Sequence, residues 1–252
     1  MKIRKFHMQY SLRTTTILLL IILTACNQPS KKNKVSPKTN PKDSIELSKD
    51  SIANSAKEKK EEKQEEKPFV LTEENAIPFF FDYQKTHKQS KVKVHTSMGN
   101  FIIDLYDNTP YHRANMIYLS SKKYFNNTFF HRVVKDFIIQ GGNTDLKMTA
   151  DKRDSIGFYL LPPDTRKGHK HIRGTVSMPS SDDVTNPHKL ASPYEFFIVT
   201  TKTGAPHLNG KFTAFGMVTS GMDVVDKINY VKTGPDEWPL TNVVIDSIEI
   251  LD

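Results

Sequence analysis

Short runs in which apolar and polar residues alternate fill the chain from Phe69 onward. Residues 91–96 (Lys-Val-Lys-Val-His-Thr) alternate strictly, and a Met-Gly-Asn turn leads into the apolar-rich run 101–106. A repeat of two residues is typical of a β-strand with one buried face. We expect further strands at about 128–133, 136–140, 174–178, 195–200, 212–218 and 243–251.

Two main helices interrupt these strands. Thr109 followed by Pro110 combines an N-cap residue with a proline at the first helical position. The helix that they open places Ala114, Ile117 and Tyr118 on one face. Residues 221–228 predict the second helix, with its valines and isoleucine facing inward. Many short strands with only two main helices favour an all-β barrel.

A short segment, residues 68–90, precedes this region. Thr72-Glu-Glu predicts the start of a helix that runs through three phenylalanines to Tyr83, and Pro78 restricts where this helix can begin. We interpret this segment as an accessory that packs on the main domain, residues 91–252.

The first 25 residues have the pattern of a targeting segment. Four basic residues and no acidic residue precede the apolar run 17–23, which is shorter than the roughly 20 residues that a membrane-spanning helix needs. The run ends in Leu-Thr-Ala-Cys, which resembles the lipobox of bacterial lipoproteins. That resemblance implies cleavage before Cys26 and a lipid anchor on it, so that the protein is held at a membrane of the cell envelope, on its periplasmic or outer-membrane face. The alternative is a plain secretory signal in which Cys26 is incidental.

Residues 26–67 predict a disordered, charged linker. From residue 27 onward they contain no aromatic side chain and are rich in Ser, Lys, Glu, Asn and Pro, which cannot bury enough apolar surface to offset the entropy of ordering. The net charge of +8 falls to +4 without the four positive charges of residues 1–25. The charge is mild, and the chain has no run of Lys and Arg interleaved with aromatic residues. We therefore do not expect the protein to bind nucleic acid. We expect a monomer.

The most informative stretch is 125–142 (FNNTFFHRVVKDFIIQGG). A single arginine, Arg132, lies among residues that predict strands, and removing a guanidinium from water is unfavourable unless it has a partner or a task. Phe137 and Gln140 follow at fixed spacing before a Gly-Gly pair. This order closely resembles the signature of the cyclophilins, the cyclosporin-binding class of peptidyl-prolyl cis-trans isomerases. The resemblance implies a closed eight-stranded antiparallel barrel capped by two helices, over about residues 91–252.

The resemblance also implies an active site and a class of substrate. Arg132, Gln140 and Phe137 are the expected catalytic residues, and the substrate is a proline-containing polypeptide. A rigid N–H donor that never deprotonates is suited to draw the lone pair onto the prolyl nitrogen, which weakens the double-bond character of the amide. The expected substrate-binding residues are Ile138, Ser180, Phe197, His207, Leu208 and Phe212.

No metal or cofactor is expected. The chemistry needs neither, and the histidines at 169, 171, 188 and 207 lack Cys, Asp or Glu neighbours at the spacing of a metal site.

Several positions depart from the family's pattern. His207 stands where the best-known eukaryotic members have tryptophan, which predicts weak binding of cyclosporin, and Phe212 stands where they have histidine. Pro179-Ser180-Ser181 replaces Ala-Asn-Ala, so one backbone donor is lost. Glu195 replaces a glutamine, and its carboxylate is predicted either to pair with Arg132 or to favour basic residues beside the substrate proline.

Two functions compete on this basis. The first is a membrane-tethered isomerase that helps cell-envelope proteins fold past slow X–Pro steps. The second is a tethered cyclophilin-like module that binds Pro-containing segments with little or no turnover. The intact Arg132, Phe137 and Gln140 favour the enzyme, whereas Pro179 and Glu195 keep the binding module open.

Overall fold

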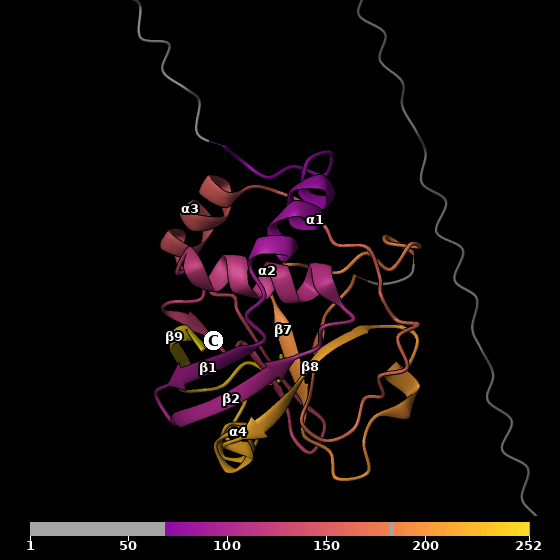
Figure 1. Ribbon diagram of the computed structural model, residues 1–252. Helices are drawn as coiled ribbons and strands as arrows, with labels where there is room; N and C mark the ends of the chain where they lie inside the picture. The colour runs from indigo at the N-terminus through magenta and orange to yellow at the C-terminus, as the bar shows by residue number, and fades with distance from the viewer. Residues whose placement is uncertain (1–68, 182–183, 252) are drawn as a thin grey trace, which may run out of the picture. The chain divides into compact units, whose positions relative to one another are not determined.

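Nine β-strands form one curled antiparallel sheet within residues 69–181 and 184–251, the part of the chain that the computed structural model describes (Figure 1). The strand order is β3-β9-β1-β2-β8-β6-β7-β5-β4. The strands are β1 (Lys91–Thr96), β2 (Gly99–Leu105), β3 (Thr128–Phe129), β4 (Arg132–Val134), β5 (Ile138–Gly141), β6 (Thr175–Met178), β7 (Phe196–Val199), β8 (Thr213–Ser220) and β9 (Val244–Leu251).

The expected eight strands become nine because the run 128–133 divides. Thr128 and Phe129 pair with β9, whereas the residues from Arg132 onward pair with β5. Between them the chain changes partners, and the backbone N–H of Phe130 donates to Val243 O at 2.9 Å. One apolar run therefore supplies both edges of the sheet, a division that its alternation does not reveal.

The prediction of a closed eight-stranded barrel is wrong in both number and closure. Strands β3 and β4 end the sheet, and no ladder of the described residues joins them. An isolated bridge links Phe129 of β3 to Asn143, which follows β5, the neighbour of β4. The all-β class is right, but the sheet is curled and open.

Four α-helices accompany the sheet in the described part of the chain. They are α1 (Ala76–Thr86), α2 (Pro110–Ser121), α3 (Lys147–Ile156) and α4 (Met222–Asn229), with a short 3-10 helix η1 (Pro206–Leu208). Both predicted main helices are present as α2 and α4. Figure 1 shows α1, α2 and α3 at one end of the sheet and α4 at the other. None of these helices is long and apolar enough to cross a membrane.

Helix α3 was not predicted, because it has little apolar pattern. Only Thr149 and Ile156 of its ten residues are buried. Helix α1 starts four residues later than the predicted start at Thr72. Thr72 and Asn75 instead form a turn in which the Thr72 N–H donates to Asn75 Oδ1 at 2.7 Å. Pro78 then lies in the first helical turn, where a missing N–H breaks no intrahelical bond.

The accessory segment packs on the domain through aromatic side chains. Phe80 is fully buried, with its ring centroid 5.8 Å from that of Tyr118 and 5.6 Å from that of Tyr159. Leu71, also fully buried, donates its backbone N–H to Ile156 O at 2.8 Å. Residues 69–86 therefore complete the core at this end. The predicted signal segment 1–25, the linker 26–67 and the anchor Cys26 lie outside the described residues.

Strand alternation divides the apolar side chains between two clusters. Val133, Ile139 and Ile198 belong to the main core inside the curl. Their neighbours Ile138, Phe197 and Val199 belong to a second, smaller cluster. Because successive strand residues point to opposite faces, this second cluster lies on the outer face of β4, β5 and β7.

Candidate active site

Three predicted site residues lie in one row across neighbouring strands. Arg132 of β4 pairs opposite Gln140 of β5, and Gln140 pairs opposite Phe197 of β7. Directly opposite residues of antiparallel strands have side chains on the same face. The register therefore brings Arg132, Gln140 and Phe197 together on the outer face of the sheet.

An apolar cluster lies on the same face. We call it the outer cluster; its buried members are Ile138, Phe197, Val199 and Ala205, and Val134, Phe137, Leu208 and Phe212 pack against them half-buried. Rings of Phe197 and Phe212 meet edge to face with centroids 5.6 Å apart. All five apolar residues that the sequence assigned to the site belong to this cluster, although 75 positions separate Phe137 from Phe212.

His207 and Ser180 occupy different positions relative to this cluster. His207 lies exposed on η1, and its ring stacks on Phe137 with centroids 5.5 Å apart. Ser180 follows β6 and forms an isolated bridge with Ala191. Its hydroxyl accepts a hydrogen bond from Asn186 Nδ2 at 2.9 Å. The contacts that hold Ser180 are thus with its own loop.

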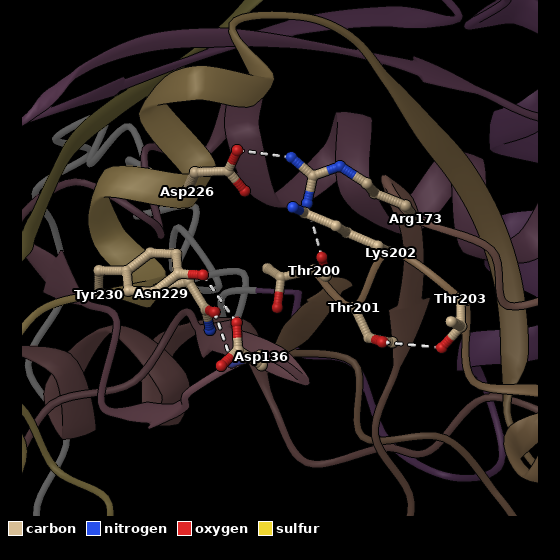
Figure 2. Close-up of a pocket in the computed structure, with 9 residues that line it drawn as sticks. All are labelled: Asp136, Arg173, Thr200, Thr201, Lys202, Thr203, Asp226, Asn229 and Tyr230. Atoms are coloured by element: carbon tan, nitrogen blue, oxygen red, sulfur yellow. Dashed lines mark hydrogen bonds and ion pairs between the residues drawn. The ribbon is translucent and has the colours of Figure 1, made fainter.

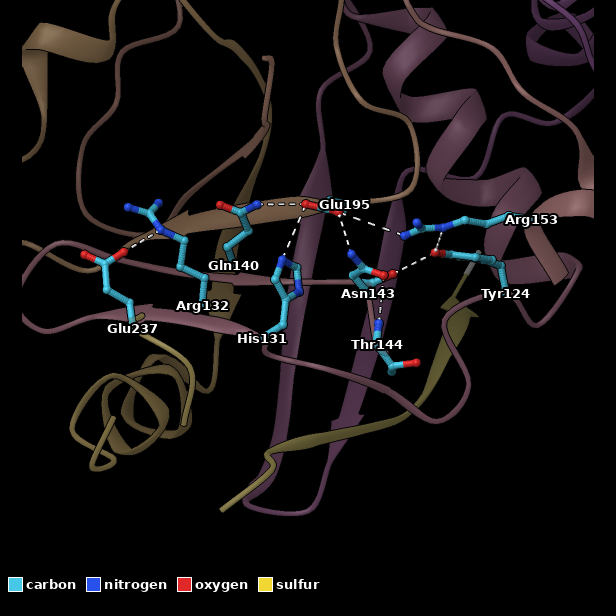
Figure 3. A network of polar contacts seen from close by, with 10 residues as sticks. Tyr124, His131, Arg132, Gln140, Asn143, Thr144, Arg153, Glu195 and Glu237 are labelled. Carbon is cyan, nitrogen blue, oxygen red and sulfur yellow. Dashed lines mark hydrogen bonds and ion pairs between the residues drawn. The ribbon is translucent and has the colours of Figure 1, made fainter. Parts of the chain in front are cut away.

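Arg132 is paired with a residue that sequence reasoning did not identify. Its Nε donates to Glu237 Oε2 at 2.6 Å, and both side chains are about 40% exposed. The terminal nitrogens of Arg132 have no partner within the described residues, and Figure 3 shows them turned away from the carboxylate. They remain available to a ligand.

Glu195 is held by several donors rather than by Arg132. Gln140 Nε2 donates to Glu195 Oε2 at 2.8 Å, and Asn143 Nδ2 donates to Oε1 at 3.1 Å. His131 Nε2 lies 3.4 Å from Oε2, and an Arg153 nitrogen lies 3.9 Å from Oε1 (Figure 3). The predicted alternative of a Glu195–Arg132 pair is therefore wrong. Arg132 pairs with Glu237, and the carboxylate of Glu195 is occupied by the four side chains around it.

These donors decide the charge of Glu195. Burial alone would raise its pKa, but His131, Gln140 and Arg153 together leave the pKa below its ordinary value. Glu195 is therefore ionised at neutral pH and can only accept hydrogen bonds.

An ionised Glu195 also fixes the orientation of the Gln140 amide. The amide nitrogen must face the carboxylate, so the amide oxygen points toward the Arg132 side (Figure 3). With a glutamine at position 195, either orientation would find a partner.

A buried tyrosine, Tyr124, holds Arg153, one of the side chains around Glu195. Arg153 Nε donates to the Tyr124 hydroxyl at 2.9 Å, and that hydroxyl donates to Gly142 O at 2.8 Å. Burial raises the pKa of Tyr124 to about 12, so the hydroxyl keeps its proton at neutral pH. Helix α3, which carries Arg153, is thereby linked to the Gly-Gly end of the signature stretch.

A polar cavity of about 430 Å³ lies beside Asp136, next to the turn that leads into β5 (Figure 2). Arg173 donates to Thr200 O at 2.6 Å and to Asp226 Oδ2 at 2.5 Å, and Tyr230 donates to Asp136 at 2.7 Å. These side chains satisfy one another, and none of the predicted site residues lines this cavity. Within the described residues, no three His, Cys, Asp or Glu side chains gather as a metal site.

The chain is similar to known proteins in both sequence and structure. Residues 91–250 match the family described as "Cyclophilin type peptidyl-prolyl cis-trans isomerase/CLD". A solved relative, the cyclophilin type peptidyl-prolyl cis-trans isomerase of Cryptosporidium parvum, is 25% identical with a TM-score of 0.55. The alignment covers 65% of this chain and 98% of that one.

Two curated relatives are similar over nearly their whole length. "Peptidyl-prolyl cis-trans isomerase CYP18-1" of Arabidopsis thaliana is 35% identical over 161 residues, which are 63% of this chain and 94% of the relative. "Peptidyl-prolyl cis-trans isomerase-like 1" of Neurospora crassa is 36% identical over 156 residues, 61% of this chain and 90% of the relative.

Proposed function

Because the chain belongs to the cyclophilin family and is a peptidyl-prolyl cis-trans isomerase, we propose that Arg132 drives its catalysis by donating a hydrogen bond to the prolyl nitrogen. The barrier to rotation about the peptide bond, about 18–20 kcal/mol, arises from the nitrogen lone pair shared with the carbonyl. A donor that draws this lone pair onto the nitrogen stabilises the twisted amide. Arg132 suits the task because its guanidinium stays protonated and its terminal nitrogens lack partners among the described residues.

The observation that carries the proposal is the shared face of Arg132, Gln140 and the outer cluster. The cluster offers Phe137, Phe197 and Phe212 to a proline ring, while Arg132 lies one strand away from Gln140. If the ring is held in the cluster, the peptide on the other side of the X–Pro bond turns past Arg132. Only interactions that strengthen in the twisted state accelerate the reaction, so Arg132 acts on turnover and the cluster on binding.

The Arg132→Ala variant tests the proposal. We expect kcat/KM on a short X–Pro peptide to fall about tenfold to hundredfold, because a hydrogen bond to a charged group is worth about 1.5–3 kcal/mol. Arg132→Lys should recover little of the loss, since a flexible ammonium cannot reproduce the planar donor.

The melting temperature of both variants should stay near that of the wild type, since Arg132 is half-exposed. Full activity in a folded Arg132→Ala protein would contradict the proposal. Peptide binding by the wild type without turnover would instead favour a binding module.

We also propose that the enzyme works at a membrane of the cell envelope as a lipid-anchored monomer, on X–Pro bonds of envelope proteins. The support is the sequence alone: the basic start, the short apolar run and the Leu-Thr-Ala-Cys motif at Cys26. Cys26→Ser should release the protein into the soluble envelope fraction or leave it unprocessed. An unmodified Cys26 in the mature protein, measured by mass spectrometry, would contradict the anchor.

A further inference from the structure

We propose that Glu237 is a positioning residue that sets the orientation of the Arg132 guanidinium. The inference rests on the catalytic role proposed for Arg132 and concerns a carboxylate 105 positions away in the sequence. Glu237 Oε2 accepts the Nε–H of Arg132 at 2.6 Å. It engages this nitrogen and leaves both terminal nitrogens outside the bond.

The loop that carries Glu237 is anchored to the strand that carries Arg132. The backbone N–H of Val133 donates to Glu237 O at 2.8 Å, next to the side-chain contact. The loop is closed by its own hydrogen bonds, from Gly234 N to Trp238 O at 2.8 Å and from Leu240 N to Lys232 O at 2.9 Å. The backbone of Glu237 is therefore fixed relative to β4 by main-chain contacts, which keep its side chain within reach of Arg132.

The backbone of Glu237 has an unusual conformation in this loop. Its φ angle is +65°, in the left-handed region that residues with a side chain rarely adopt. The Glu237 N–H donates to Gly234 O at 3.1 Å, which holds this turn. This turn sets the direction in which the side chain of Glu237 leaves the backbone, and the carboxylate reaches Arg132 on β4.

Binding at Nε has a geometric consequence. A guanidinium is planar and rigid, and its plane contains both the Nε–H and the Cδ–Nε bonds, so holding the Nε–H in one direction on a side chain anchored in β4 fixes the plane in which the other four N–H groups lie. Without an acceptor at Nε, the long arginine side chain samples several rotamers, and its terminal nitrogens are aligned with the prolyl nitrogen for less of the time. Misalignment of a catalytic donor costs turnover more than substrate binding.

The pair contributes little to folding by comparison. Both side chains are about 40% exposed, and ion pairs at this exposure are largely screened by water and salt. Glu237 should therefore affect turnover while leaving the melting temperature nearly unchanged. This combination separates a positioning role from a structural one.

The test compares Glu237→Ala with Glu237→Gln in the full chain, on a short X–Pro peptide. We expect Glu237→Ala to lower kcat about threefold to thirtyfold with KM within twofold. Glu237→Gln should keep most of the activity, because its amide oxygen still accepts the Nε–H at the same place. The matched control is Glu249→Ala, which removes an exposed carboxylate paired with His95 on β1 and should leave kcat unchanged.

A double-mutant cycle completes the test. In the Arg132→Ala background, Glu237→Ala should cause no further loss, since the residue that it orients is gone. Fluorescence of Trp238, the single tryptophan of the chain, reports whether the loop keeps its structure in each variant.

An unchanged or higher kcat in Glu237→Ala would overturn the inference, and a higher value would mean that the carboxylate competes for Arg132. An equal loss in the Arg132→Ala background would also overturn it. The proposed role of Arg132 fails separately, if Arg132→Ala alone keeps full activity.

Discussion

His207 stacks on Phe137 at the edge of the outer cluster, with ring centroids 5.5 Å apart and an angle of 23° between the planes. The imidazole thus covers one side of the cluster at the position where the better-known eukaryotic cyclophilins have an indole. An indole has a larger apolar face and a strong N–H donor, and stacked aromatic pairs are worth about 0.5–1.5 kcal/mol. The identity of this single ring should therefore control which ligands bind.

We expect His207→Trp to strengthen cyclosporin binding about threefold to tenfold, measured by isothermal titration. A suitable control is His169→Trp, since His169 also stacks on an aromatic ring, that of Tyr106, but lies outside the outer cluster. An unchanged Kd for His207→Trp would mean that the drug contacts a different part of the surface.

Glu195→Gln should lower the free energy of unfolding at pH 7 by about 1–3 kcal/mol. The variant keeps the shape but loses the charge that four side chains surround, and it brings a donor against donors. Urea unfolding measures the difference. Glu249→Gln, at an exposed pair with His95, should change stability by less than about 0.5 kcal/mol.

The stabilisation from Glu195 should depend on pH in a defined direction. Its folded-state pKa lies below the ordinary 4.5, so the unfolded carboxyl takes up a proton first as the pH falls. The advantage of the wild type over Glu195→Gln is then fully present above about pH 4.5 and shrinks at lower pH. A difference that grew on acidification would contradict this account.

Helix α1 should be required for folding although it precedes residues 91–250, which match the cyclophilin family. Phe80→Ala should cost about 3–5 kcal/mol, because it removes a fully buried ring between α1, α2 and Tyr159. The adjacent Phe81→Ala provides the control, since Phe81 is 50% exposed and should change stability by less than about 1 kcal/mol. Thermal unfolding compares the two.

Chain truncation gives a second measure of the same segment. A chain that begins at Pro68 should match the full chain in melting temperature and activity, because the linker has no apolar residue pattern to pack. A chain that begins at Lys91 loses Leu71 and Phe80 and should unfold at a much lower temperature. Equal stability of the two truncated chains would show that α1 is only an appendage.

His112 should make the fold sensitive to mild acid. The imidazole is fully buried in α2, neither ring nitrogen has a hydrogen-bond partner among the described residues, and burial lowers its pKa to about 3. In the unfolded chain, His112 has a pKa of 6.5 and binds a proton that the buried imidazole of the folded protein does not bind. The free energy of unfolding therefore falls as the pH falls from about 6.5. Between pH 7 and pH 5 this amounts to about 2 kcal/mol.

His112→Leu should reduce this slope, whatever its effect on stability at pH 7. The measurement is the free energy of unfolding in urea at pH 7, 6 and 5, all above the range in which Glu195 titrates. His188→Leu, at an exposed position, should keep the slope of the wild type. A slope that His112→Leu leaves unchanged would mean that other groups cause the acid sensitivity.

The amino-acid sequence determined the parts of this protein that depend on neighbouring residues. Alternation located strand β1 at its observed ends, and Thr109-Pro110 located the start of α2. The order of residues in 125–142, with Arg132, Phe137 and Gln140 at the spacing of the cyclophilin signature, pointed to the family by resemblance, because this signature is a continuous segment of the chain. The same resemblance assigned five apolar members of the outer cluster, Phe137, Ile138, Phe197, Leu208 and Phe212.

The tertiary structure decided what depends on segments that are distant in the chain. Arg132 meets Glu237 across 105 positions and Gln140 meets Glu195 across 55, and both contacts arise from how loops lie against strand edges. No local pattern contains these contacts, so the sequence offered Glu195 as one possible partner of Arg132 and did not indicate Glu237. Whether the sheet closes likewise depends on the twist summed over all its strands, and on the point in 128–133 where pairing with β9 ends. Local periodicity sets the direction of each side chain, and only the packed chain sets which side chains meet.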